Sequence, residues 1–163
     1  MQGQATREAR EHVDAVFKDF GEPSAAVAII VATREEGIQA SDVLQELTSR
    51  GIAHQLHELS PHRDAALLAQ FAQTAALRGV RVIIALAGIA PSLPSIVAAH
   101  TDLPVIGVPL PSQALGGLDT LLATVQCPPG KPVACMSIGG LRNAAVFAAT
   151  ILSAMPLPPT DGE

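Results

Sequence analysis

The chain alternates short, continuous apolar runs with segments in which apolar residues recur at helical spacing. The apolar runs predict buried strands over residues 25–32, 80–87, 105–108 and 133–138. A weaker strand is predicted over residues 53–59, where the alternation of apolar and polar residues is imperfect. Helical spacing predicts helices over residues 38–47, 67–75, 92–100, 118–125 and 143–154. Continuous apolar strands separated by helices are typical of a parallel sheet that is covered on both faces.

This order of elements predicts one α/β domain over residues 23–155, a flavodoxin-like three-layer α/β/α fold with a central parallel sheet. Residues 1–22 are predicted to form an N-terminal helical extension, because Val13, Val16, Phe17 and Phe20 recur at helical spacing. This apolar stripe either packs within the protein's own oligomer or forms a surface for another partner. Residues 156–163 are predicted to be a short, frayed C-terminal tail.

The composition favours an oligomer and argues against several classes of partner. Hydrophobic residues make up 48% of the chain and charged residues only 15%, which leaves little polar material to cover a monomer. We therefore expect a large surface to be buried between identical subunits. The net charge of −5, without a cluster of Lys or Arg, argues against a nucleic-acid partner.

The sequence also argues against a membrane partner and favours a cytoplasmic, reduced protein. The most apolar stretch, residues 80–99, is interrupted by Arg81, Pro91 and Pro94. Residues 1–20 lack the apolar core of a signal peptide. The two cysteines, Cys127 and Cys135, lie far from any metal-ligand spacing, and Cys135 is expected to be a small buried hydrophobe.

Candidate chemistry is expected at the carboxyl ends of the predicted strands, where open parallel sheets bind their ligands. The most informative of the segments that follow strands is residues 60–64. His62 offers a group that titrates near neutral pH, and Arg63 offers a planar fork for phosphate or carboxylate. Alternatively, Ser60 or Asp64 caps a helix and His62 is only an exposed loop residue.

The second half of the chain carries a long ordered match to a known family. Its clearest stretch is residues 103–109, Leu-Pro-Val-Ile-Gly-Val-Pro, followed by Ser112, Gly117-Leu118-Asp119 and Pro132-Val133-Ala134. With these residues, the chain resembles the phosphoribosylaminoimidazole carboxylase family of purine biosynthesis, also called N5-carboxyaminoimidazole ribonucleotide mutase. The resemblance runs from about Val27 to Leu152. It implies a homo-octamer with active sites between subunits, and a reaction that needs no metal or organic cofactor.

The loop after the second strand matches the family's Ser-Ala-His-Arg motif as Ser60-Pro61-His62-Arg63. By resemblance, His62 is the general acid and base, Arg63 contacts phosphate, and Ser60 and Pro61 bind substrate. The implied substrate is an aminoimidazole ribonucleotide, with carbon dioxide or bicarbonate as the second small molecule. The carboxyl group leaves as carbon dioxide, is held in the pocket, and is reattached at a ring carbon while the histidine handles the proton.

Two other ligand loops depart from the family pattern. The family's Gly-Ser-x-Ser-Asp loop is replaced by Ala32-Thr33-Arg34-Glu35-Glu36, which places Thr33, Glu35 and Glu36 at the substrate. Glu36 is expected to reach a ribose hydroxyl. Glu35 puts a carboxylate where the family has a hydroxyl that binds phosphate. Two such charges about 4 Å apart repel by roughly 1 kcal/mol in water and roughly 4 kcal/mol at an effective dielectric constant near 20.

The family's Gly-Ala-Gly-Gly-Ala-Ala-His loop also differs here, at the positions expected to cover the imidazole and carboxyl group. The resemblance assigns Ala87, Gly88, Ile89 and Ser92 to this loop, with Ser92 in place of the family histidine. Ile89 and Pro91 add bulk and stiffness where glycine and alanine stand in the family.

Three functions follow from this combination of one matched motif and two altered ones. The first is a carboxylase or mutase of the family type that acts on the purine intermediate. The second is a divergent paralogue that acts as carboxylase or decarboxylase on a less anionic heterocycle. The third is a non-catalytic oligomeric binding protein.

Overall fold

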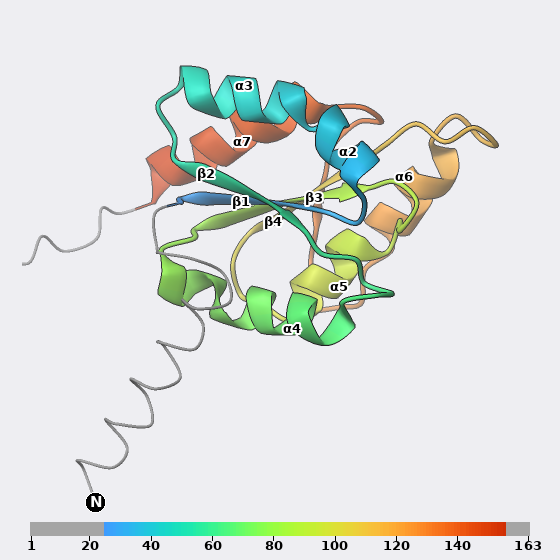
Figure 1. The fold of residues 1–163 in the computed structure, drawn as a ribbon, viewed down its shortest axis with the longest axis horizontal. Helices are drawn as coiled ribbons and strands as arrows, with labels where there is room; N and C mark the ends of the chain where they lie inside the picture. The colour runs from blue at the N-terminus through green and yellow to red at the C-terminus, as the bar shows by residue number, and fades with distance from the viewer. Residues whose placement is uncertain (1–24, 156–163) are drawn as a thin grey trace, which may run out of the picture.

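A parallel five-stranded sheet forms the centre of the protein in the computed structural model, which describes residues 25–155 (Figure 1). The strands are β1 (Val27–Val31), β2 (His54–Glu58), β3 (Val82–Ala87), β4 (Val105–Pro109) and β5 (Ala134–Cys135). They lie in the order β2-β1-β3-β4-β5, with every neighbouring pair parallel. This is the flavodoxin-like order, in which the direction of strand addition reverses between β1 and β3.

Helices cover both faces of the sheet, which confirms the predicted three-layer α/β/α fold (Figure 1). Helices α3 and α7 lie on one face, and α4 and α5 lie on the other. The helical elements are α2 (Arg34–Gln39), α3 (Ser41–Ser49), α4 (Ala65–Thr74), the 3-10 helix η1 (Ala75–Arg78), α5 (Leu93–Ala99), α6 (Leu118–Val125) and α7 (Leu141–Ala154). None of these helices is long and apolar enough to cross a membrane.

Strand β1 explains why the predicted strands are continuously apolar. All five of its residues are buried, and alternate side chains point to opposite faces. Val27, Ile29 and Val31 pack in the core beneath α3 and α7, whereas Ala28 and Ile30 pack in the core beneath α4 and α5. A strand that contributes to two cores has no polar face.

The structure departs from the predicted elements at two helical segments. The helix predicted over 38–47 is two helices, because Ala40 ends α2 and also precedes α3. The Ala40 N–H donates to the carbonyl of Glu36, while its own carbonyl accepts from Leu44 N–H, so the backbone turns without glycine or proline. The helix predicted over 67–75 is α4, followed by the separate 3-10 turn η1.

Strand β5 is shorter than predicted and lies at the edge of the sheet. After Met136 N–H donates to Gly107, the chain turns, and Gly139 N–H donates to the carbonyl of Pro109. The prediction that Cys135 is a small buried hydrophobe is wrong, because its side chain on this edge strand is only half-buried. Partial burial, and then the nearby Cys127 thiol, raise the pKa of Cys135. The predicted N-terminal extension and C-terminal tail lie outside the described residues.

Candidate functional site

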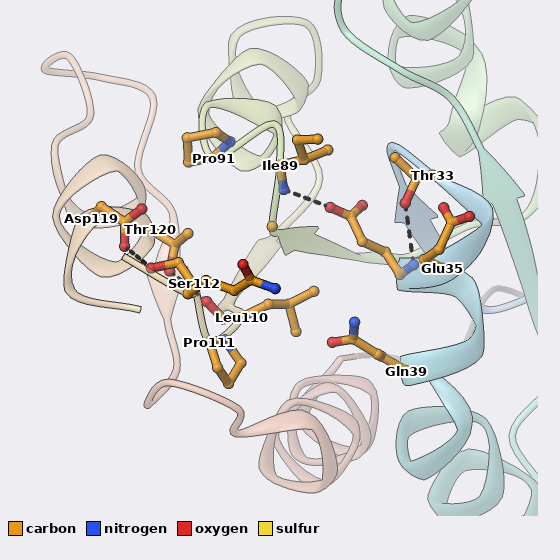
Figure 2. A pocket seen from close by; sticks show the side chains of 13 residues that line it. Thr33, Glu35, Gln39, Ile89, Pro91, Leu110, Pro111, Ser112, Asp119 and Thr120 are labelled. Carbon is orange, nitrogen blue, oxygen red and sulfur yellow. Dashed lines mark hydrogen bonds between the residues drawn. The ribbon is translucent and has the colours of Figure 1, made fainter. Parts of the chain in front are cut away.

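A pocket of about 670 Å³ opens where β1, β3 and β4 end (Figure 2). Its volume lies within the range of small-molecule sites, and it adjoins the β1/β3 switch point at which sheets of this order bind ligands. Three loops supply its walls. The lining residues are Thr33, Glu35, Glu36, Gln39, Gly88, Ile89, Pro91, Leu110, Pro111, Ser112, Gln113, Asp119 and Thr120.

The first wall is the turn from β1 into α2, which is held by two side chains. Thr33 caps α2, because its hydroxyl oxygen accepts from the Glu36 N–H at 3.3 Å. The Glu36 side chain is buried, and its Oε2 accepts from Ala32 N–H at 2.8 Å. Its other oxygen, Oε1, accepts from Ile89 N–H at 2.9 Å. Glu36 therefore joins the first wall to the second.

The second wall is the loop from β3 into α5. A Cβ atom on Gly88 would overlap Glu36 Oε1 and lie 3.0 Å from Glu36 Cδ, so a side chain at this position competes with the carboxylate for space. The Ile89 side chain is 79% exposed beside the pocket, and Pro91 lines it further along the loop. This wall therefore presents a large apolar surface to any bound molecule.

The third wall is the loop from β4 into α6, which is organised by Ser112. The Ser112 hydroxyl donates to Asp119 Oδ1 at 2.6 Å and accepts from Gly117 N–H at 3.2 Å. The hydrogen bond from Ser112 lowers the pKa of Asp119, which keeps this carboxylate ionised at neutral pH. Buried Thr120 donates its hydroxyl hydrogen to the carbonyl of Leu110 or Gly117, each 2.8 Å away.

The electrostatic character of the pocket follows from its acidic lining. The charged side chains among its described lining residues are Glu35, Glu36 and Asp119, all carboxylates. Arg63 is the basic residue of the adjacent loop, but its Nη2 donates to the Ala32 carbonyl at 3.2 Å and to Glu58 Oε1 at 3.1 Å. The pocket in one chain is therefore an acidic and partly apolar environment.

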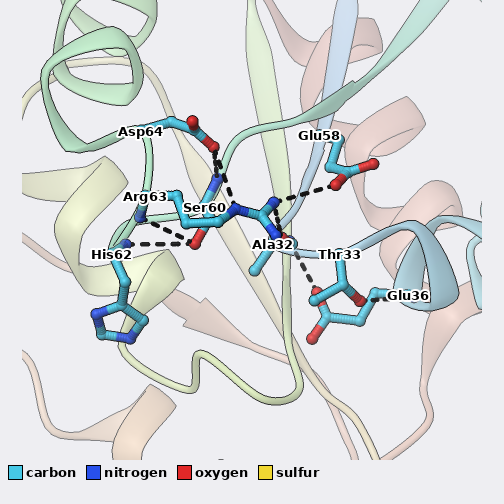
Figure 3. A network of polar contacts seen from close by, with 8 residues as sticks. All are labelled: Ala32, Thr33, Glu36, Glu58, Ser60, His62, Arg63 and Asp64. Carbon is cyan, nitrogen blue, oxygen red and sulfur yellow. Dashed lines mark hydrogen bonds and ion pairs between the residues drawn. The ribbon is translucent and has the colours of Figure 1, made fainter.

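The loop from β2 into α4 forms a separate turn beside the pocket (Figure 3). Buried Ser60 accepts hydrogen bonds on its hydroxyl oxygen from the N–H groups of His62, at 3.3 Å, and Arg63, at 3.4 Å. The Ser60 N–H donates to Asp64 Oδ2 at 3.0 Å. These bonds hold the backbone of the turn and leave the His62 side chain exposed at the carboxyl edge of the sheet.

The structure divides the residues predicted for the site into two groups. Thr33, Glu35, Glu36, Gly88 and Ile89 line the pocket, and Ala87 is the buried last residue of β3 directly before it. Ser60, Pro61, His62 and Arg63 form the neighbouring turn and do not line the pocket. Arg63 links the two groups through its bond to the Ala32 carbonyl.

Ser92 directly follows Pro91 of the second wall but is not among the residues that line the pocket. It stands before α5 and accepts on its carbonyl from the Ser95 hydroxyl at 2.8 Å.

The sequence predicted a ligand-binding segment after the fourth strand, which contains Ser112 and Gln113, but named neither of them, nor Asp119 and Thr120, as a site residue. The available signal was their position, because Ser112 follows the β4 strand and Asp119 stands in the first turn of the next helix. Within residues 25–155, no group of three or more His, Cys, Asp or Glu side chains is placed to hold a metal ion.

Comparison with known proteins identifies the chain's relatives. It is 45% identical over 126 residues to the N5-carboxyaminoimidazole ribonucleotide mutase of Saccharolobus solfataricus, covering 77% of this chain and 80% of that protein. It is 44% identical over 133 residues to the protein of the same name from Pseudomonas aeruginosa, covering 80% and 82% of the two chains.

The solved structures agree with these relatives. The crystal structure of Treponema denticola PurE superposes with a TM-score of 0.70 at 25% sequence identity, covering 78% of this chain and 79% of that chain. The family model for AIR carboxylase matches residues 26–156, which span the whole sheet and all the helices described above. The chain belongs to the AIR carboxylase family.

Proposed function

We propose that this protein is an N5-carboxyaminoimidazole ribonucleotide mutase of purine biosynthesis. The observation that carries the proposal is the 45% identity, over 77% of the chain, to a relative of that name. In the proposed reaction, the exocyclic nitrogen takes up a proton as its bond to the carboxyl group breaks and carbon dioxide is released. The ring carbon then attacks carbon dioxide and loses its own proton, so that the product is an isomer of the substrate.

His62 is the proposed proton carrier. Its side chain is exposed at the carboxyl edge of the sheet, on a turn whose backbone is held by Ser60 and Asp64. An imidazole can accept the proton from the ring carbon and return it to the nitrogen of the next substrate. Ser60, Pro61 and Arg63 are proposed to contact substrate from the same turn.

The adjacent pocket is proposed to hold the heterocycle and the released carbon dioxide. Ile89, Pro91, Leu110 and Pro111 give it apolar walls, which favour an uncharged gas molecule over water. Thr33, Glu35, Ala87, Gly88 and Ser92 are proposed to lie near the ribonucleotide. No step in this scheme uses a metal or an organic cofactor.

We further propose that the site is completed between subunits of a homo-octamer. Helix α6 presents Leu118, Leu122 and Val125 on one face at helical spacing, and these side chains are 49%, 48% and 51% exposed in the single chain. A second copy of the chain would cover this stripe. Native mass spectrometry should give eight times the 16.8 kDa of one chain, and Leu122→Glu should reduce that mass.

A turnover assay tests the catalytic proposal. The purified protein is mixed with N5-carboxyaminoimidazole ribonucleotide, or with aminoimidazole ribonucleotide and bicarbonate, and the C-carboxylated product is measured by mass spectrometry. His62→Asn should abolish product formation, whereas His100→Asn, at an exposed position after α5, should leave it unchanged. Undiminished turnover in His62→Asn would contradict the assignment, and no turnover in the assembled native protein would favour a binding role.

A second candidate keeps the same chemistry on a less anionic carboxylated heterocycle. The observation that favours it is the set of carboxylates, Glu35, Glu36 and Asp119, that supplies the charged lining of the pocket. Calorimetric titration with a ribonucleotide and its dephosphorylated nucleoside separates the two candidates. Tighter binding of the nucleoside would support the second candidate, and tighter binding of the ribonucleotide would support the first.

A further inference from the structure

We infer that Glu36 is a positioning residue that fixes the β3–α5 loop across the β1/β3 switch point, rather than a residue that binds the ligand. The Glu36 carboxylate accepts from Ala32 N–H at 2.8 Å and from Ile89 N–H at 2.9 Å, so each of its oxygens holds one backbone amide. Ala32 directly follows β1 and lies four residues before Glu36, whereas Ile89 stands two residues after the end of β3 and 53 residues after Glu36. Figure 2 shows the bond from Ile89 crossing between the two walls.

The position of Glu36 corresponds to the point at which the ladder between β1 and β3 stops. Paired residues run from Val27 with Val82 to Ile30 with Ala85, and no pair follows them. Beyond this point β3 remains paired with β4 as far as Ala87 and Pro109, while the chain after β1 turns into α2. The Glu36 carboxylate joins the diverging segments and replaces a direct backbone bond between them.

The burial of Glu36 supports this structural role. Its side chain is 4% exposed, and a buried carboxylate is stable only when hydrogen bonds replace its water. The two amides supply those bonds. Neighbouring Glu35, in contrast, is exposed and lines the pocket.

Gly88 completes the arrangement because it leaves room for the carboxylate. A Cβ atom at this position would overlap Glu36 Oε1 and come within 3.3 Å of Glu36 Cγ. The requirement at Gly88 is therefore space for the Glu36 side chain. Together, Glu36 and Gly88 determine where Ile89 and Pro91 stand as a wall of the pocket.

Amide hydrogen exchange, measured by NMR on the full-length protein, tests this inference without any ligand. Glu36→Ala should speed the exchange of both the Ala32 and Ile89 amides by about tenfold or more, the effect of losing a charge-assisted hydrogen bond. Glu36→Gln should speed at least one of them, because its NH2 group cannot accept. Glu36→Asp should not restore protection, since its carboxylate is one methylene shorter.

The matched control for exchange is Glu35→Gln, which removes the adjacent charge and should leave both amides within about twofold of the native rate. Gly88→Ala should destabilise the protein, because the new methyl group overlaps the Glu36 carboxylate. The double variant Gly88→Ala/Glu36→Ala should recover part of the lost stability, because the carboxylate is then absent. Native exchange at both amides in Glu36→Gln and Glu36→Ala would overturn the inference.

The effect on catalysis is a second readout, which rests on the proposed function. A positioning role predicts that Glu36→Gln lowers kcat and raises KM together with faster exchange at the loop. A ligand-binding role predicts a raised KM with unchanged exchange, and that result would overturn the inference. If the native protein shows no turnover, the proposed function fails, while the exchange rates still decide the role of Glu36.

Discussion

Strand β2 and the turn that follows it each carry a histidine, and the two side chains lie in opposite environments. His57 packs in the layer beneath α4, with its ring centroid 4.5 Å from that of Phe71. His62, beyond the end of the strand, is exposed at the carboxyl edge. The two residues are of the same type, so their positions make the difference. A histidine within the strand packs against a helix, whereas one beyond the carboxyl end of the strand is free to act as a proton carrier.

The environment of His57 favours its neutral form. Burial, and then the positive charge of Arg78, together lower the pKa of His57 to about 4. Its Nε2 atom is buried without a hydrogen-bond partner in the described part of the chain. The guanidinium carbon of Arg78 lies 4.0 Å from the centroid of the same Phe71 ring, and burial lowers the pKa of Arg78 to about 10. A protonated His57 would therefore add a second buried cation.

The largest expected effect comes from removing the ring on which His57 and Arg78 pack. Phe71→Ala should lower the free energy of unfolding by about 3–5 kcal/mol, because Phe71 is completely buried and its loss leaves a cavity. Urea unfolding measures the change. Phe147→Ala, at a position 38% exposed on α7, is the control and should cost about 1 kcal/mol or less. Equal losses in the two variants would contradict this account of the His57 environment.

The next effect is a dependence of stability on pH. The pKa of His57 is about 4 in the folded state and about 6.5 in the unfolded state, so the unfolded state binds its proton first as the pH falls. The contribution of neutral His57 is complete above about pH 6.5 and is lost between about pH 6.5 and pH 4. Allowing for its partial exposure, we expect a loss of about 1–2 kcal/mol.

His57→Gln isolates this contribution from other acid-sensitive groups. The difference in unfolding free energy between the native protein and the variant should shrink as the pH falls from 7 to 4. Carboxylates such as Glu46, whose pKa is lowered by hydrogen bonds from Arg50 and Arg142, contribute equally to both proteins. A difference that is constant over this range would show that His57 does not carry the dependence.

A smaller effect is expected within the turn that holds His62. Ser60→Ala removes the oxygen that accepts from the His62 and Arg63 amides and should cost about 1 kcal/mol. Its turnover should also fall, because the backbone that carries His62 loses two bonds. Ser153→Ala, near the end of α7 where the hydroxyl is exposed, is the control for stability and should cost less than about 0.5 kcal/mol.

The smallest effect on stability is expected for His62 itself. His62→Asn should change the unfolding free energy by less than about 0.5 kcal/mol, because the side chain is exposed. The same change should abolish turnover under the proposed function. A stability loss as large as that of Phe71→Ala would show that the two histidines are not in different environments after all.

Much of the fold could be predicted from the sequence, because buried strands and amphipathic helices leave a periodic pattern. Helix α6 has the predicted bounds, and β1, β3 and β4 lie within one or two residues of theirs. The break at Ala40 could not be predicted, since no glycine or proline marks it and the backbone bonds of Glu36 and Leu44 define it. The length of β5 depends on its pairing with β4, which stops at Gly107 and Cys135 although β4 continues to Pro109, and such pairing is a tertiary property.

The candidate site could be located from the sequence, but its internal contacts could not be predicted. Strand ends indicated the edge of the sheet at which the pocket opens, and Thr33, Glu35 and Gly88 line that pocket. The contact between Glu36 and Ile89 joins residues 53 positions apart, beyond the reach of any local pattern. The division between this pocket and the turn that carries His62 also depends on how separate loops are arranged around the switch point.

The fit between Glu36 and Gly88 constrains the order in which these two positions of the chain can change. A side chain cannot be gained at position 88 while a long carboxylate fills the adjacent space, although it becomes possible once position 36 has shortened. If a side chain is gained at position 88 first, the intermediate protein has no room for the Glu36 carboxylate and loses the hydrogen bonds that hold the loop. Mutational paths through this site are therefore directional, and the two positions are expected to vary as a pair among homologues.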